Sequence, residues 1–163
     1  MSEWLISIVE SFRNHTMARE NLEPSYDSII YTELGFGTME HSGIYMSDGE
    51  VIDLSGDGRI RRVSLKEFTG HITTFNHEIY VPCYPDWDGT ISTSMAGYRA
   101  SEKVGESRNY KLVMDNCHQF CAGCVTGDFE NASNFLWMLK GVVQQEHGEK
   151  VLWKKWDWKT EYN

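Results

Sequence analysis

The chain has 163 residues, a formal net charge of −9 and a hydrophobic fraction of 40%. That length and that fraction suit one compact domain with a sizeable core rather than two independent domains. The acidic balance argues against a main role in binding nucleic acids, whose protein partners display basic surfaces.

The sequence shows neither a membrane-spanning run nor a secretion signal. No stretch approaches 18 uninterrupted apolar residues, and residues 1–4 lack the cationic lead and apolar run of a signal peptide. We therefore expect a cytoplasmic protein, with export as an effector left open.

Hydrophobic spacing predicts an α+β order of elements, which begins with an amphipathic helix over residues 3–13. A strand over 28–32 and a Gly-rich loop over 35–37, a candidate border of a substrate cleft, lead into a hairpin that starts at His41. The remaining expected elements are a turn over 55–58, a strand over 60–63, a short helix over 64–68 capped at Ser64, a strand over 77–84, a long loop over 84–94, and helices over 95–104, 116–125 and 131–145.

The hairpin from His41 to Asp53 can adopt two registers, and they differ in where the carboxylate points. A two-residue turn over 48–49 pairs Asp53 with Ile44 and places it on the opposite face from His41. That register keeps the two polar side chains apart.

A three-residue turn over 47–49, with its last glycine left-handed, gives the other register. Met46 then pairs with Glu50, and Asp53 lies opposite Gly43. We expect this second register, because it serves both the chemistry and the hydrophobic pattern.

In this register His41 and Asp53 become diagonal neighbours on one face, with backbones roughly 7–8 Å apart, and Gly43 leaves the space between them empty. A carboxylate at that distance can orient an imidazole. The other face gathers an apolar set for the core, made of Ile44, Met46, Ile52 and Leu54.

Cys117 lies at the start of the expected helix over 116–125 and is a candidate nucleophile for His41 to activate. The positive end of a helix and a nearby imidazolium both favour a thiolate, and the backbone N–H of Cys117 is the natural oxyanion donor there. Tyr45 and Gly43 share the strand face of His41 and are candidate substrate contacts, with a purely structural role for Tyr45 as the alternative.

Two strings in this arrangement resemble known motifs. They are His41-Ser42-Gly43-Ile44-Tyr45 and Asn116-Cys117-His118-Gln119-Phe120, which are similar to the H-box and NC-box of the lecithin:retinol acyltransferase-like proteins. That family belongs with the permuted papain-like thiol enzymes of NlpC type, and the likeness spans roughly residues 25–127.

The resemblance implies a small antiparallel sheet packed on helices. It also implies a catalytic triad of Cys117 as nucleophile, His41 as base and Asp53 as the residue that orients His41. The family often has a second His at that last position, where this chain has Asp. Residues 1–24 would then be an N-terminal helix and lead-in, 25–127 the catalytic core, and 128–163 a C-terminal helix and tail, all in one domain.

The other cysteines have a simpler explanation. Cys121 and Cys124 follow Cys117 at near-helical spacing and are expected to pack in the core. Together with Cys83 they match no standard zinc motif. We therefore predict no metal and no cofactor.

The tail over residues 151–159 mixes tryptophan with lysine. Trp153, Trp156 and Trp158 would suit peripheral contact with a membrane interface. The same alternation suits a terminal strand that packs its tryptophans on the domain, and we favour packing.

The resulting expectation is a cysteine-dependent acyl hydrolase or acyltransferase that works through a thioester on a lipid or another acyl-bearing substrate. A peptide or amide hydrolase of NlpC type is one alternative, and a non-catalytic binding or effector module on the same fold is another. The sequence sets neither the acyl donor nor the oligomeric state.

Overall fold

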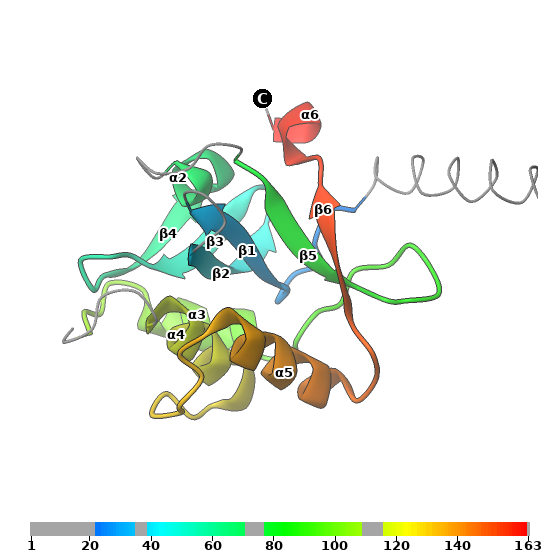
Figure 1. The fold of residues 1–163 in the computed structure, drawn as a ribbon. Coiled ribbons are helices and arrows are strands. Elements are labelled where there is room, and N and C mark those ends of the chain that lie inside the picture. Colours follow the sequence, from blue (N-terminus) through cyan, green and yellow to red (C-terminus); the bar gives the residue numbers. More distant parts are fainter. Residues whose placement is uncertain (1–21, 35–38, 71–76, 109–115, 163) are drawn as a thin grey trace, which may run out of the picture.

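The computed structural model of the chain describes residues 22–34, 39–70, 77–108 and 116–162. The helix predicted over 3–13 and the loop predicted over 35–37 lie outside these residues. The described part is an antiparallel six-stranded sheet with helices on both faces, which confirms the predicted α+β class (Figure 1).

The sheet has the strand order β4-β3-β2-β1-β5-β6. The strands are β1 (Ile29–Leu34), β2 (Met39–Ser47), β3 (Glu50–Leu54), β4 (Ile60–Ser64), β5 (Ile79–Cys83) and β6 (Leu152–Trp156). The helices are α2 (Leu65–Thr69), α3 (Ala96–Lys103), α4 (Asn116–Thr126), α5 (Leu136–His147) and α6 (Trp158–Tyr162).

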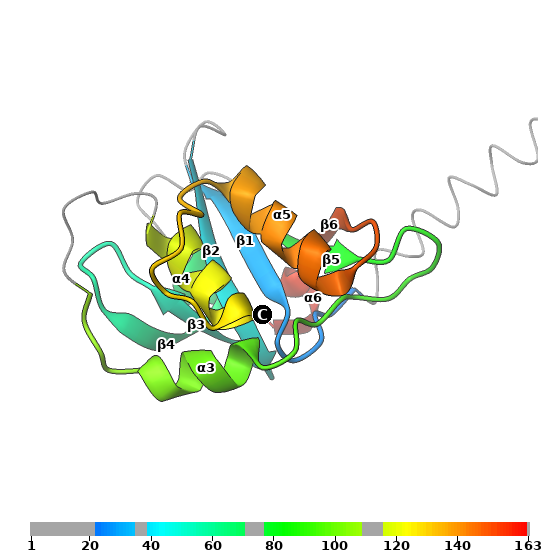
Figure 2. The same ribbon diagram turned by 90° about the horizontal axis from the view of Figure 1, so that it is seen from below.

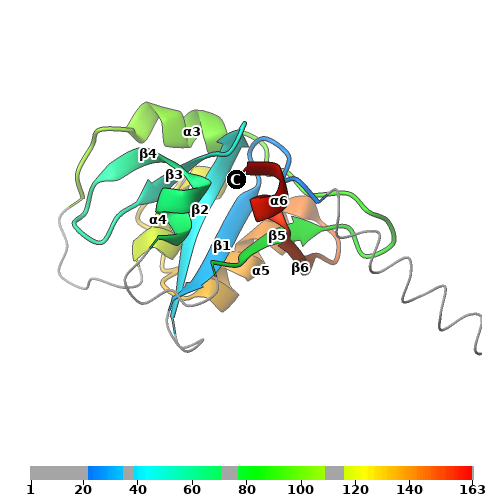
Figure 3. The ribbon, with the colours of Figure 1, turned by 90° about the horizontal axis from the view of Figure 1, so that it is seen from above.

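The sheet separates two hydrophobic clusters. Helices α3, α4 and α5 cover one face, as the view from below shows (Figure 2). The short helices α2 and α6 cover the other face (Figure 3). The first cluster contains the predicted apolar set, namely Ile44, Met46, Ile52 and Leu54. The second contains Tyr45, Val51, Phe68, Trp156 and Trp158.

The β2–β3 hairpin has the predicted register at the polar pair but a different turn. Gly43 lies opposite Asp53, as expected. The turn, however, has two residues, because Ser47 pairs with Glu50 and both residues over 48–49 have positive φ, as a type I′ turn requires. The predicted pairing of Met46 with Glu50 is therefore wrong. Instead Met46 is an extra residue in a β-bulge of β2. The bulge shifts the pairing of the two strands by one residue, so that Asp53 lies opposite Gly43 rather than Ile44.

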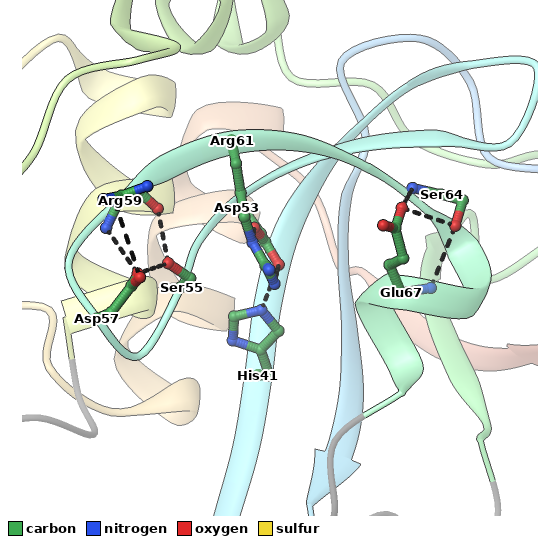
Figure 4. Close-up of polar contacts among 8 residues, drawn as sticks. All are labelled: His41, Asp53, Ser55, Asp57, Arg59, Arg61, Ser64 and Glu67. Carbon is green, nitrogen blue, oxygen red and sulfur yellow. Dashed lines mark hydrogen bonds and ion pairs between the residues drawn. The ribbon is translucent and has the colours of Figure 1, made fainter.

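Helix α2 begins as predicted. The Ser64 hydroxyl accepts a hydrogen bond from the Glu67 amide, and the Glu67 carboxylate accepts one from the Ser64 amide. This reciprocal capping box stabilises a helix of only five residues, and the helix holds Phe68 in the second cluster. Figure 4 draws both bonds.

Helix α5 begins at Leu136, five residues later than predicted. Asn131 is the reason, because its side-chain amide donates to the carbonyls of Gln119 and Asp128 and its side-chain oxygen accepts from the Ser133 amide. An Asn side chain that bonds neighbouring backbone in this way competes with helix formation.

The tail forms an edge strand. Strand β6 pairs with β5 along its whole length, with Trp156 opposite Ile79. Trp156 and Trp158 are buried. Their burial favours the alternative in which the tail packs on the domain, because a buried indole cannot contact a membrane. The exposed tryptophans among the described residues are Trp87 and Trp137, at 60% and 69%.

Candidate active site

His41 and Asp53 form a buried pair at the centre of the site. The distance from His41 Nε2 to Asp53 Oδ2 is 2.9 Å, and both residues are almost completely enclosed. Figure 4 shows the two side chains reaching toward each other from adjacent strands. The Met46 bulge makes this possible, since without it Asp53 would lie on the opposite face of the hairpin.

Arg61 fixes the Asp53 carboxylate from the other side. Its Nε donates to Oδ1 at 2.8 Å and its Nη2 donates to Oδ2 at 3.1 Å. Arg61 lies directly opposite Asp53 in the β3–β4 ladder. Burial raises the pKa of Asp53, but the hydrogen bonds and charges of His41 and Arg61 outweigh burial and lower it overall. The carboxylate is therefore ionised at neutral pH.

Arg61 was not among the predicted site residues. A turn over 55–58 alone would pair Asp53 with Ile60, whereas in the structure Leu54 pairs with Ile60 and Arg61 therefore lies opposite Asp53. A bidentate guanidinium–carboxylate contact is the expected result.

The Phe68 ring packs against the His41 ring. The two rings lie 5.1 Å apart between centroids, tilted by 37°. A Cβ at Gly43 would come within 2.6 Å of Val51 Cγ1 and 2.9 Å of Phe68 Cε2. The expectation of empty space beside Gly43 is therefore wrong, because apolar groups fill it and the glycine permits their close approach.

Cys117 is the second residue of α4 and is buried. Burial alone would raise its pKa, but hydrogen bonds with His118 and His41, and the charges of both, hold that pKa well below the usual value. Burial likewise lowers the pKa of His41, but hydrogen bonds with Asp53 and Cys117 raise it overall to about 9. The structure places His41 against Asp53, and the pKa shifts of Cys117 and His41 favour a thiolate and an imidazolium.

A second histidine, His118, follows Cys117 in the chain and contributes to its lowered pKa. Its Nδ1 lies 2.8 Å from Ser42 Oγ, and both residues are buried. His118 was not among the predicted site residues. No local pattern indicates this contact, because it joins residues 76 positions apart.

Tyr45 lies on the predicted face but its hydroxyl points into a different cluster. It donates to Glu23 Oε1 at 2.6 Å and accepts from the Gly49 amide, while its ring packs edge-on against Trp156. These contacts favour the structural alternative for Tyr45 over substrate contact.

The remaining cysteines are free and buried. Burial raises the pKa values of Cys83, Cys121 and Cys124, so these three are neutral thiols at neutral pH. Within the described part of the chain, no group of three or more His, Cys, Asp or Glu is placed to hold a metal ion. The same residues include no helix long and apolar enough to cross a membrane.

Comparison with known proteins adds one finding to this geometry. The family model described as lecithin retinol acyltransferase matches residues 28–130, which is more than half of the chain. A search of curated proteins found no match.

Proposed function

Because the chain belongs to the lecithin retinol acyltransferase family, we propose that it transfers or hydrolyses acyl groups through a thioester on Cys117. The observation that carries the proposal is the buried His41–Asp53 hydrogen bond of 2.9 Å, and Cys117 contributes to the raised pKa of the same imidazole. A base, its orienting carboxylate and a nucleophile are the parts that thiol catalysis requires.

His41 serves its two neighbours through different ring nitrogens. Since Nε2 bonds Asp53, the hydrogen bond with Cys117 falls to Nδ1. Asp53 keeps the ring in one orientation and stabilises its positive charge, as the carboxylate of a triad does. Arg61 in turn keeps Asp53 ionised and immobile.

The proposed reaction has two halves. The Cys117 thiolate attacks the acyl carbonyl, and the backbone N–H of Cys117 donates to the oxyanion. The C–O or C–N bond then breaks, and the departing oxygen or nitrogen takes the proton from His41. In the second half, neutral His41 removes a proton from water or an acceptor hydroxyl, which attacks the thioester and releases the thiolate.

The family favours an acyl ester, such as a lipid, as the donor. To test the donor class, wild-type protein is incubated separately with a phospholipid, an acyl thioester and a peptide ester, and its intact mass is measured. We expect a mass increase equal to one acyl group in the wild type and none in Cys117→Ala.

Cys124→Ala is the matched control, because it removes a buried thiol from the same helix and leaves His41, Asp53 and Cys117 unchanged. It should acylate as the wild type does. Equal acylation of Cys117→Ala would contradict the nucleophile. Acylation by the peptide ester alone would favour the peptide hydrolase, and no adduct together with slow alkylation of Cys117 would favour a binding module.

A further inference from the structure

Thr32, in β1, carries a polar atom that the fold does not use. The residue is completely buried, and within the described part of the chain its Oγ1 has no hydrogen-bond partner. A buried hydroxyl that gives up its bonds to water and gains none in exchange destabilises the folded state. Valine would fill the same volume and suits a strand as well, so neither packing nor strand propensity explains the hydroxyl.

This hydroxyl lies beside His41. In the antiparallel ladder of β1 and β2, Thr32 is directly opposite His41, so the two side chains share a face, with Cβ atoms about 4.5–5.5 Å apart. Asp53 reaches the imidazole from β3, the neighbour on the other side of β2. His41 is therefore flanked by a bonded carboxylate from one neighbouring strand and by an unused hydroxyl from the other.

The other side chains around Thr32 on this face are apolar. Ile79 lies directly opposite it in β5, Ile30 precedes it by two residues, and Phe68 packs on His41. All three belong to the second cluster and offer the hydroxyl no hydrogen bond. An oxygen atom that enters between β1 and β2 here therefore has two polar partners, the imidazole and the Thr32 hydroxyl.

The proposed reaction brings an oxygen to His41 in each half. His41 is only 5% exposed, so a molecule that reaches its ring to exchange a proton also comes within reach of the residue directly opposite. A departing oxygen is still surrounded by the rest of its substrate, whereas an attacking water has no other anchor. The second half of the reaction therefore depends more strongly on an additional contact.

We propose that Thr32 binds the acyl acceptor, water or an alcohol, and holds its oxygen against His41 in the second half of the reaction. The proton of the acceptor goes to neutral His41, its oxygen forms the new C–O bond, and the C–S bond breaks to release the thiolate. The Thr32 hydroxyl can donate to the acceptor or accept from it, and it keeps its own proton. The inference rests on the proposed function.

The first test asks whether the fold uses the hydroxyl, and it needs no substrate. Thr93→Val is the matched control, because Thr93 is also buried but its Oγ1 donates to the Asp27 carbonyl at 2.7 Å. In urea unfolding we expect the midpoint of Thr32→Val at or above that of the wild type, and the midpoint of Thr93→Val below it. A Thr32→Val midpoint as low as that of Thr93→Val would overturn the proposal.

The second test measures how long the acyl group stays on Cys117. Each protein is acylated with the donor that labels the wild type, freed of that donor, and kept in buffer with ethanol, so that water and a small alcohol are both offered. Intact mass over time gives the decay rate of the adduct. We expect decay about tenfold slower in Thr32→Val, the effect of one hydrogen bond, and near the wild-type rate in Thr32→Ser and Thr93→Val.

Alkylation of Cys117 by iodoacetamide separates a lost acceptor contact from damage to the thiol. The reaction involves no acceptor, so Thr32→Val should react as fast as the wild type. Alkylation slowed in the same proportion as adduct decay would overturn the proposal, because Thr32 would then act through His41 or Cys117. A wild-type adduct that neither water nor ethanol releases would overturn it as well.

Failure of this inference and failure of the proposed function give different results. An adduct that forms on Cys117 and decays at the same rate in the wild type and in Thr32→Val would remove the role of Thr32 and leave the proposed function standing. No adduct in the wild type would remove the proposed function, and the role of Thr32 with it.

Discussion

At the scale of single residues, the proton on His41 has the widest consequences. The ring bonds Asp53 directly and Arg61 through it, and its pKa rises from 6.5 to about 9. The imidazolium is thus the resting form at neutral pH, and it is the form that protonates a leaving group.

This pKa predicts different pH profiles for two reactions of the same sulfur. As pH rises through about 9, His41 loses its proton, so kcat/KM for acyl transfer should fall. Alkylation of Cys117 needs only the thiolate and should not fall over that range. Stopped-flow assays of both reactions from pH 6 to 10 check this, and parallel profiles above pH 9 would count against His41 as the acid.

Arg61 offers a second prediction at this scale. Arg61→Met leaves the buried Asp53 with one cationic partner, so we expect a loss of about 1–2 kcal/mol in the free energy of unfolding, a range that allows for the 40% exposure of Arg61. The rate of acyl transfer should fall on the order of tenfold, because His41 is less firmly oriented.

Arg62→Met is the matched control for that change. Arg62 is the next residue of β4, and it pairs with the exposed Glu50 at 2.9 Å, away from the site. Its loss should change the unfolding free energy by less than about 0.5 kcal/mol and leave the rate unaltered. Urea unfolding and a steady-state assay measure both quantities, and equal effects of the two variants would deny Arg61 its role.

At the scale of elements, the β2–β3 hairpin shows what the sequence can and cannot predict. The pairing of Asp53 with Gly43 was predictable, because only that register gathers the polar pair on one face and Ile44 with Ile52 on the other. The turn was not. A third turn residue and a bulge at Met46 shift the register by the same single step, so facial patterning cannot distinguish them.

Other elements follow the same division. The start of α2 was predictable because Ser64 and Glu67 carry a local capping signal. The start of α5 depends on Asn131 bonding the carbonyl of Gln119 in α4, and the position of His118 depends on Ser42 in β2. Such contacts exist only after the elements have packed, which is why the sequence did not indicate them.

The close approach of α2 to the hairpin leads to a prediction about Gly43. Gly43→Ala places a methyl group against Val51 Cγ1 and Phe68 Cε2, so it should cost about 1–3 kcal/mol in unfolding free energy. It should also move Phe68 off His41 and slow alkylation of Cys117. Urea unfolding and alkylation kinetics measure the two effects.

Val51→Ala supplies the test of cause. It removes the nearest obstructing atom, so Gly43→Ala/Val51→Ala should be less destabilised than the sum of the two single variants. Strict additivity in that double-mutant cycle would show that the Gly43→Ala cost does not come from the contact with Val51.

At the scale of the whole molecule, the tryptophans divide into structural and exposed groups. Trp156→Ala should lower the free energy of unfolding by about 3–5 kcal/mol, because it empties a site in the second cluster. Trp137→Ala, on the exposed surface of α5, should change it by less than about 0.5 kcal/mol. Urea unfolding separates the two.

Contact with lipid should follow the opposite order. In sedimentation with phosphatidylcholine vesicles we expect Trp137→Ala to reduce binding, because an exposed indole is the one that can enter the headgroup region. The conservative Trp156→Phe should bind as the wild type does. A greater loss of vesicle binding in Trp156→Phe than in Trp137→Ala would indicate that the tail contacts the membrane.

The chain order of the site's parts has a consequence for the newly made protein. His41 and Asp53 are 12 residues apart in one hairpin, a unit that can close in microseconds, whereas α4 must dock from far along the chain, and distant contacts form late. Until it docks, Cys117 lacks the contact with His41 that helps to lower its pKa. A chain emerging from the ribosome therefore carries no activated sulfur, and the reactive thiolate forms only after α4 has packed on the sheet.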